Sequence, residues 1–516
     1  MQKLISLACA VLFPLNPIFS APPVPPLRAG VQQAINAVNA AELKGDLSFL
    51  ASDVLQGRFT PSPGLDVAAE FIAAKFRAAG LEPGGDHEYF QTAEMVDRRL
   101  PAMVSGLTLY LNDRSLLVPA VDIAVKADSQ PAHLDHVPVL ILAAKDSRLL
   151  QGLDVKGKAV ITPDSDWDSQ TGEKRRAGYM KMRAFNQAVA ASGAAVAITV
   201  AGNRQLPGQP RLLSAAEISA PSAPMLAVRS EELAKLVGSP VQGATVSTDI
   251  PAPLDNKVTL KNVIGILRGS DQELSKTAVL LTAHYDHIGT VDTAGQMSMH
   301  GPGDSPDRIY NGANDDGSGT VSVIEIARAL AHIEPRPKRS IVFMTFFGEE
   351  RGELGSQFYG KHPVFPISQT VADVNLEQVG RTDSTVGPQL NNASVTGFDF
   401  SDVTGFLVRA GARLGVKVYR DPEASDAYFT RSDNDALAEQ GVPAHTLCVA
   451  FDYPDYHGVG DEWQKINYEN MAKVDRAVLL ALVDIADSKK KPEWNAKNQK
   501  TEPFRAARDA SLKTGQ

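Results

Sequence analysis

Between residues 257 and 488, short runs of apolar residues alternate with stretches whose apolar residues recur at helical spacing. "TAVLLTAH" at 277–284 and "SIVFMTFFG" at 340–348 are two of the runs, and "GTVSVIEIARALAHI" at 319–333 lies between them. A strand that is apolar on both sides is buried on both faces, and intervening helices favour parallel pairing. The alternation therefore predicts an α/β fold with a mostly parallel sheet covered by helices on both faces.

The rest of the chain differs in character from this region. Lys3 and the apolar run broken by Pro14 and Pro17 are typical of a secretory signal peptide, being too short and too interrupted for a membrane span. Short β-type runs around a Gly/Pro-rich stretch indicate a separate β-rich module in the middle of the chain. The polar C-terminal tail is expected to be loosely held. The expected parts are a signal peptide (1–20), N-terminal helices of the main domain (21–104), the inserted module (105–255), the main α/β domain (256–488) and the tail (489–516).

Composition excludes several classes of protein. The chain has 516 residues, of which 43% are hydrophobic and 22% charged, so it can bury large cores in two or more domains. The formal charge of −9 and the lack of a long Lys/Arg cluster argue against a nucleic-acid partner. We expect an exported protein, periplasmic or secreted, with no membrane span in the mature chain and no disulfide, because only Cys448 remains after the leader. The oligomeric state stays open.

Acidic residues and histidines follow the apolar runs where strands are expected to end. In open α/β sheets, ligands bind beyond the carboxyl ends of the strands. Imidazole and carboxylate groups without thiolates are typical of a hydrolytic zinc site. Five ligands suit two Zn²⁺ ions that share one carboxylate, and Asp315, in the glycine-rich "NGANDDGSG", is the expected bridge. The five expected ligands are His284, Asp315, Glu350, Glu377 and His457.

Neighbouring residues suggest the rest of a catalytic site. Glu349, beside Glu350, is expected to act as general base on a metal-activated water and then to protonate the leaving nitrogen. Asp286 would accept the other N–H of His284, and Tyr456 would donate a hydrogen bond to a developing oxyanion. Taken singly, each feature has a plain alternative, such as a capped turn for "NDDGSG" or a solvated helix start for the paired glutamates. Their joint occurrence in one domain favours a metal site.

The ordered set "AHYDH", "NGANDDGSG", "FFGEERGELGS", "VNLEQVGR" and "DYHGVGDEWQKI" resembles the signature of the dizinc exopeptidases that include bacterial leucyl aminopeptidases and glutamate carboxypeptidase. The resemblance implies a three-layer α/β/α phosphorylase/hydrolase-like peptidase domain, the same ligands, base and bridge, and a cis peptide between Asp315 and Asp316. Glu377 stands where many members have Asp, a difference of one methylene. The middle module is similar to the protease-associated (PA) domain that many members carry, although a passive β-rich lid is an equal alternative.

The substrate is less constrained by the sequence. We expect an aminopeptidase acting on peptides, by analogy with exported members of the family that share this domain order. Arg431 and Asp433, in "YFTRSDNDAL", are candidate substrate-binding residues, although they could equally pair with their neighbours. A carboxypeptidase or dipeptidase on the same metal centre is the enzymatic alternative. A non-enzymatic, receptor-like binding protein is the distant one, because such relatives have lost metal ligands that are present here.

Overall fold

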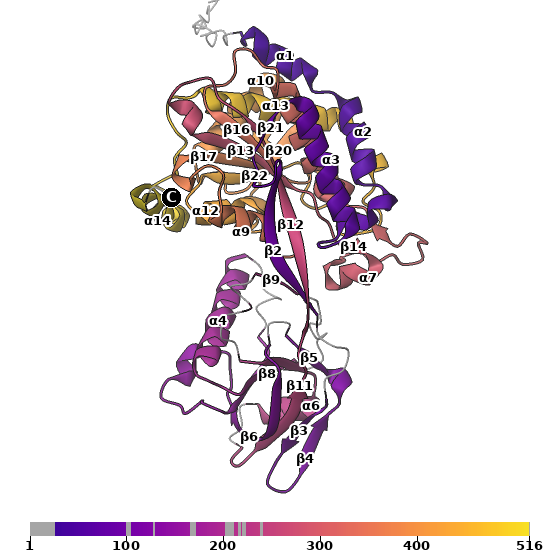
Figure 1. Cartoon of the computed structure of the whole chain (residues 1–516), viewed down its shortest axis with the longest axis vertical. Helices are drawn as coiled ribbons and strands as arrows, with labels where there is room; N and C mark the ends of the chain where they lie inside the picture. Colours follow the sequence, from indigo (N-terminus) through magenta and orange to yellow (C-terminus); the bar gives the residue numbers. More distant parts are fainter. Residues whose placement is uncertain are drawn as a thin grey trace, which may run out of the picture.

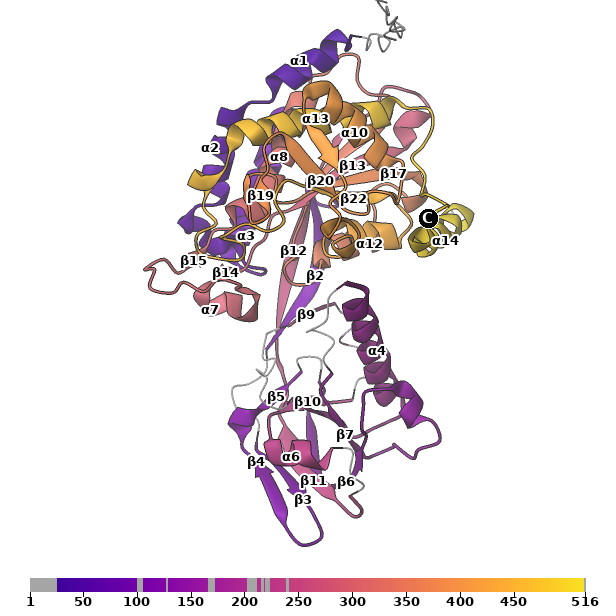
Figure 2. The ribbon, with the colours of Figure 1, turned by 180° about the vertical axis from the view of Figure 1, so that it is seen from behind.

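The computed structural model describes residues 26–99, 105–126, 129–165, 172–201, 211–214, 218, 223–237 and 241–514. The expected signal peptide lies outside these residues. Figures 1 and 2 show a larger body above and a smaller body below. Two long antiparallel strands, β2 (Phe90–Arg99) and β12 (Leu254–Leu267), run from the larger body towards the smaller one.

A mixed sheet forms the centre of the larger body. In the described residues its order is β21-β20-β22-β17-β13-β16-β12-β2-β9, and β1 also pairs with β12. The four neighbours β22, β17, β13 and β16 are mutually parallel, whereas β12, β2 and β9 add antiparallel strands at one side. The further strand bounds are β1 Glu82–Pro83, β9 Arg211–Ser214, β13 Ala278–His284, β16 Ser340–Phe346, β17 Thr370–Leu376, β20 Asn392–Val395, β21 Lys417–Tyr419 and β22 Ala444–Cys448.

Helices cover both faces of this sheet, which confirms the predicted α/β fold. Along β13, Val279 and Leu281 pack into one hydrophobic core, whereas Ala278 and Leu280 pack into another. Successive side chains of a strand point to opposite faces, so an uninterrupted apolar run supplies both cores. The first core is covered by α1 (Ala29–Ala37), α2 (Ala40–Leu50), α3 (Pro63–Ala79), α8 (Gly319–Leu330), α10 (Val403–Leu414) and α13 (Tyr468–Asp487). The second is covered by α9 (Leu354–Lys361), α12 (Asn434–Glu439) and α14 (Glu502–Thr514).

The sequence explains the bounds of α3. The Ser62 side chain accepts a hydrogen bond from the Leu65 N–H and caps the first turn, and Pro63 occupies the first helical position. The helix ends where Gly80 adopts a left-handed conformation with φ of 77°.

The smaller body contains a second sheet with the order β4-β3-β11-β6-β7-β8-β10-β5 in the described residues. Its identity as a PA domain stays a prediction. One strand leaves this body: β9, which follows β8 in the chain, pairs antiparallel with β2 in the larger sheet. The elements are β3 Leu107–Tyr110, β4 Ser115–Val118, β5 Ile123–Val125, β6 Ala132–Ile141, β7 Ala159–Pro163, α4 Gly172–Ala191, β8 Val196–Val200, β10 Met225–Val228, α6 Glu231–Leu236 and β11 Thr245–Ile250.

The expectation of a loosely held tail is wrong. Residues 502–514 form α14, and Phe504 is only 5% exposed. Trp494 stacks on Phe504 with ring centroids 5.0 Å apart, and its indole N–H donates to the Gly441 carbonyl. A few buried aromatic side chains hold a tail whose composition is otherwise polar.

Candidate metal centre

The predicted site residues lie beyond the carboxyl ends of the parallel strands. His284 ends β13, and Glu377 directly follows β17. Glu349 and Glu350 come after β16, beyond Gly348, whose φ of 68° ends the extended backbone. Because the strand has already ended there, the two adjacent glutamates need not face opposite sides of the sheet, and both reach the site.

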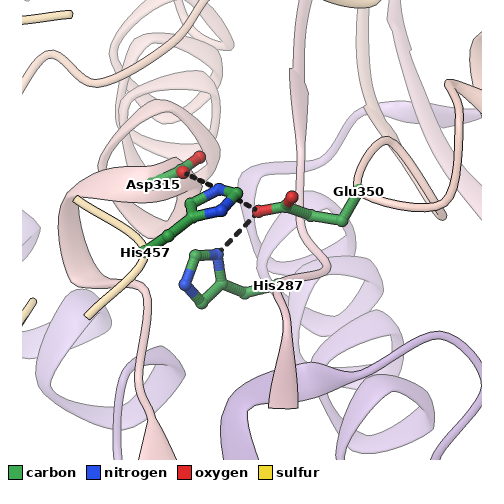
Figure 3. A group of neighbouring side chains, drawn as sticks. All are labelled: His287, Asp315, Glu350 and His457. Carbon is green, nitrogen blue, oxygen red and sulfur yellow. Dashed lines mark ion pairs between the residues drawn. The ribbon is translucent and has the colours of Figure 1, made fainter. Parts of the chain in front are cut away.

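The structure brings the five expected ligands together in two groups that share Asp315. One group contains His284, Asp315 and Glu377, with His284 Nε2 3.4 Å from Asp315 Oδ1 and 3.6 Å from Glu377 Oε1. The other contains Asp315, Glu350, His457 and a further residue, His287 (Figure 3). In this second group His457 Nε2 lies 3.1 Å from Asp315 Oδ2 and 3.2 Å from Glu350 Oε1. The longer side chain of Glu377 therefore still reaches its group.

Unsatisfied polar atoms show that these residues fit metal ions. Buried polar atoms normally have hydrogen-bond partners, because an unpartnered one carries its full desolvation cost. His284 Nε2, Asp315 Oδ2 and Glu350 Oε1 are buried without such a partner in the described part of the chain, and they face one another across the two groups. Nitrogen and oxygen donors that converge in this way are suited to zinc. The described residues can thus hold two metal ions, as the sequence predicted.

The electrostatics of the site also favour cations. Burial acts to lower the pKa of His457, but Glu350 and Asp315 outweigh it and raise the pKa to about 12. Burial likewise acts to lower the pKa of His284, and Glu349 together with other carboxylates raises it well above its usual range. The surrounding carboxylates therefore stabilise positive charge at the site. Protons and metal ions would compete for the same donor atoms.

Hydrogen bonds to backbone carbonyl groups orient the rings of His284 and His457. His457 Nδ1 lies 2.6 Å from the Met297 carbonyl oxygen, and His284 Nδ1 lies 3.2 Å from the Asp286 carbonyl oxygen. A carbonyl oxygen can only accept, so each Nδ1 carries the proton and each Nε2 is left as a donor atom for a metal. Both Nε2 atoms point into the groups described above.

Asp286 lies where the sequence predicted, behind His284, but its carboxylate makes more contacts than expected. Asp286 Oδ1 is 3.5 Å from His284 Nδ1, slightly farther than the backbone oxygen of Asp286. The same Oδ1 accepts the Glu349 N–H at 3.1 Å, and Oδ2 accepts the Thr60 hydroxyl at 2.9 Å. Asp286 thus links the His284 loop to the backbone of Glu349.

Two buried charges near the site escaped the sequence analysis. Arg58 is fully buried and donates to the carbonyl oxygens of Leu50, Tyr285, Asn311 and Gly312 at 2.7–3.0 Å. It thereby joins the loop after β13 to the loop that carries Asp315. A lone arginine in "LQGRFT" carries no signal of burial, because arginine is ordinarily a surface residue.

Asp461 holds the Asp315 loop from the other side. Its carboxylate accepts the backbone N–H groups of Asn314 and Asp315, and the Tyr453 hydroxyl donates to it at 2.9 Å. The peptide bond between Asp315 and Asp316 is cis, as the family resemblance implied. Asp461 lies four residues after His457 in the motif "DYHGVGDEWQKI". Its closeness to an expected ligand was the one feature of the sequence that indicated a role in the site.

The remaining predicted residues differ in their placement. Tyr456 is half-buried and stacks on the His457 ring at 4.2 Å, and burial raises the pKa of its hydroxyl well above the usual value. Arg431 is exposed and lies over the Tyr428 ring at 4.4 Å. Asp433 is fully buried, and burial raises its pKa to about 7. The Tyr456 hydroxyl therefore keeps its proton and can donate a hydrogen bond. Arg431 and Asp433 differ from each other in burial, the first being exposed and the second buried.

Residues 262–482 match the model of Peptidase family M28. The chain therefore contains an M28 peptidase domain. The M28 domain includes all the parallel strands of the larger sheet and both groups of candidate ligands, and the family resemblance predicted from the sequence is confirmed. Among the described residues, no helix combines the length and apolarity needed to cross a bilayer.

Relatives of the M28 domain include a "Probable zinc metalloprotease" of Pyrenophora teres f. teres, 33% identical over 147 residues that cover 27% of this chain and 28% of the relative. A "Leucine aminopeptidase 2" of Arthroderma otae is 26% identical over 295 residues, 52% of this chain and 53% of the relative. The match thus spans 28% of the length of the first relative and 53% of the length of the second.

Solved structures with the same fold include an aminopeptidase from Aneurinibacillus sp. strain AM-1, with a TM-score of 0.59 and 19% identity. This alignment covers 88% of this chain and 96% of that one. A zinc aminopeptidase from Bacillus subtilis has a TM-score of 0.51 and 20% identity, covering 88% and 97% of the two chains. Both likenesses extend beyond the M28 domain itself.

Proposed function

We propose that this protein is an exported, zinc-dependent exopeptidase that releases N-terminal residues from peptides. The observation that carries the proposal is the placement of Asp315 between two groups of ligands, with the Glu349 carboxylate 3.9 Å from His284. Two ions that share one carboxylate, with an acid or base beside them, suit hydrolysis of an amide. The named relatives, a zinc metalloprotease and a leucine aminopeptidase, support the same chemistry.

In this proposal the ligand set divides into two. His284, Asp315 and Glu377 would hold one Zn²⁺, and Asp315, Glu350 and His457 the other. Zinc at these positions supplies Lewis-acid polarisation of the scissile carbonyl and lowers the pKa of the attacking water.

Side chains of the protein would perform the proton transfers. Glu349 takes a proton from the water as its oxygen forms a bond to the carbonyl carbon, and the Tyr456 hydroxyl donates a hydrogen bond to the carbonyl oxygen as it gains charge. Glu349 then passes the proton to the leaving nitrogen as the C–N bond breaks. The products are a free amino acid and a peptide shortened by one residue, and Glu349 is again a carboxylate.

A preference for the amino end rests on the charge of the site. Two Zn²⁺ ions would offset the charges of Asp315, Glu350 and Glu377. Glu349 and Asp433 are acidic residues near the His284 group that lie outside the proposed ligand set. These two residues would favour a cationic α-amine over an anionic α-carboxylate. Arg431, which would bind a substrate carboxylate in a carboxypeptidase, is exposed and packed on Tyr428. The leader-like residues 1–20 support export to a periplasm or beyond.

The test uses one peptide library in three forms, free, N-acetylated and C-amidated, with products followed by mass spectrometry. We expect loss of N-terminal residues from the free and amidated forms, no cleavage of the acetylated form, and loss of all cleavage after chelation until Zn²⁺ is restored. Cleavage of acetylated but not amidated peptides would establish a carboxypeptidase instead. No zinc-dependent cleavage in any form would contradict the proposal.

A further inference from the structure

We propose that His287 is an additional metal ligand, so that the two ions are held unequally. The inference rests on the proposed function, because it assigns a residue to the same metal centre. His287, Asp315, Glu350 and His457 would hold one ion with four side chains, whereas His284, Asp315 and Glu377 would hold the other with three. His287 lies outside the five ligands expected from the sequence.

Among the residues that the structure describes, neither nitrogen of the buried His287 ring has a hydrogen-bond partner. The side chain is 0% exposed, and both Nδ1 and Nε2 are unsatisfied. His445 is equally buried, but its Nε2 lies 2.5 Å from the Ser401 hydroxyl and its Nδ1 2.8 Å from the Thr396 oxygen. A buried imidazole normally resembles His445 in this respect. In the described residues, Nδ1 of His287 faces only the Glu350 carboxylate and Nε2 has no hydrogen-bond partner, so the ring is open to a further partner such as a metal ion.

The position of the ring favours coordination over an ion pair with Glu350. His287 Nδ1 lies 2.9 Å from Glu350 Oε1, an ion-pair contact in which neither atom has a hydrogen-bond partner among the described residues. Figure 3 shows His287 and His457 approaching the same Glu350 oxygen. His457 is itself an expected ligand, so His287 converges on the same point as the rest of the group.

The surrounding backbone fixes the ring in this place. A Cβ atom at Gly312 would lie 2.4 Å from His287 Cγ, so only glycine leaves room for the imidazole. Gly312 has φ of 55°, which glycine adopts without strain. The His287 N–H donates to the Arg58 carbonyl at 3.3 Å, and its ring meets the His457 ring edge-on with centroids 5.4 Å apart. The site is therefore built around the His287 side chain.

Unequal ligand sets have a chemical consequence. An ion with four protein ligands is closed in the manner of a structural site, whereas an ion with three keeps an open position for water or substrate. The Glu350 group would then retain its ion more tightly and anchor the centre. The His284 group, which lies beside Glu349, would hold the ion that is lost first on chelation.

The experiment uses Co²⁺ as the probe and ¹H NMR of the full chain as the readout. Each imidazole bound to Co²⁺ gives a strongly shifted N–H signal. With both groups filled we expect one such signal from each of His284, His287 and His457. The variant His287→Ala should lack one of these signals and should bind Co²⁺ at one site at least ten-fold more weakly. His287→Asn is the second variant, should the alanine variant fold poorly, and circular dichroism of both checks folding. The exposed His332→Ala is the control and should keep every signal.

The outcomes separate the two proposals. A wild-type spectrum with shifted signals from His284 and His457 only, unchanged by His287→Asn, would overturn the role of His287 and leave the metal centre intact. Failure of the wild-type chain to take up Co²⁺ at all would overturn the metal centre itself.

Discussion

At the scale of single residues, Glu349 and Glu350 are adjacent in sequence but differ in their contacts. Glu350 faces His287 and His457, whereas the nearest histidine to Glu349 is His284 at 3.9 Å. Burial raises the pKa of Glu349 well above its usual range, while the pKa of Glu350 is lowered to about 2 because the histidines outweigh burial. One carboxyl is thus poised to exchange a proton and the other to remain an anion.

Glu349→Gln should therefore lower kcat by about 10²–10⁴-fold, the usual contribution of a general acid–base, with little change in KM. Its zinc content should equal that of the wild type. The matched variant Glu350→Gln should lose zinc under the same dialysis. Steady-state kinetics and elemental analysis of both variants check this, and equal zinc loss from both would contradict the division of roles.

Asp475 gives a pH-dependent prediction away from the metal centre. It is fully buried at the contact of α13 with α8, and burial raises its pKa from 3.8 to about 8. The pKa of Asp475 is higher in the folded chain than in the unfolded chain. Its contribution to stability is therefore complete below about pH 4 and is lost as the pH rises towards 8. The loss is about 1.4 kcal/mol per pH unit in that window.

Asp475→Asn removes this titration. The free energy of unfolding of the variant minus that of the wild type should be larger at pH 7 than at pH 5, by up to about 2.7 kcal/mol. Urea unfolding of the zinc-loaded proteins at both values measures it. A gain that is equal at the two pH values would show that Asp475 does not titrate there.

At the scale of elements, Arg58 ties separate loops of the site together. The guanidinium bonds four carbonyl oxygens, which belong to the end of α2, the loop after β13 and the loop before Asp315. Removing a buried charge that satisfies such groups leaves them unpaired. The N-terminal helices therefore contribute to the site although none of the candidate ligands lies on them.

Arg58→Met should destabilise the chain by about 3–5 kcal/mol and weaken zinc binding at both groups. Arg77→Met is the control, because Arg77 lies on the nearby α3 but is exposed and paired with exposed Glu88. Thermal unfolding and zinc titration of both variants decide the point. Equal behaviour of the two variants would contradict the positioning role of Arg58.

The sequence predicted most of the candidate ligands because they follow apolar strands, and parallel strands bring their carboxyl ends to one edge. Asp315 was predicted instead from the glycine-rich stretch that precedes α8. It did not predict His287 or Arg58. His287 is three residues from His284 in a loop, and sequence spacing does not determine which way a loop side chain points. Arg58 owes its burial to carbonyl groups more than 200 residues away, such as those of Tyr285 and Asn311.

At the scale of the whole molecule, β2 and β12 form the connection between the two bodies. Arg99 pairs with Leu254, so the two residues that flank the segment 100–253 lie side by side. The sequence analysis did not predict this ribbon, because its strands mix polar and apolar residues and their pairing is long-range. The packing of α14 was missed for a similar reason, since Phe504 packs against Phe429, which lies 75 residues earlier in the chain.

Replacing residues 100–253 by an Asn-Gly turn removes the smaller body together with the edge strand β9, and should leave the rest of the larger body folded, because that turn closes a two-residue antiparallel hairpin. We expect zinc binding to persist and single-residue leucyl amides to be cleaved within about ten-fold of the wild-type rate, with a changed preference for longer peptides. Loss of zinc binding would show that the smaller body supports the metal centre.

The most direct test of the whole account is a zinc titration of the metal-free chain, with bound zinc and release of N-terminal residues measured on the same samples. We expect that activity requires the pair of ions held around Asp315, and that Asp315→Asn abolishes both the paired binding and the activity. Full activity of the metal-free chain, or of Asp315→Asn without paired zinc, would contradict it.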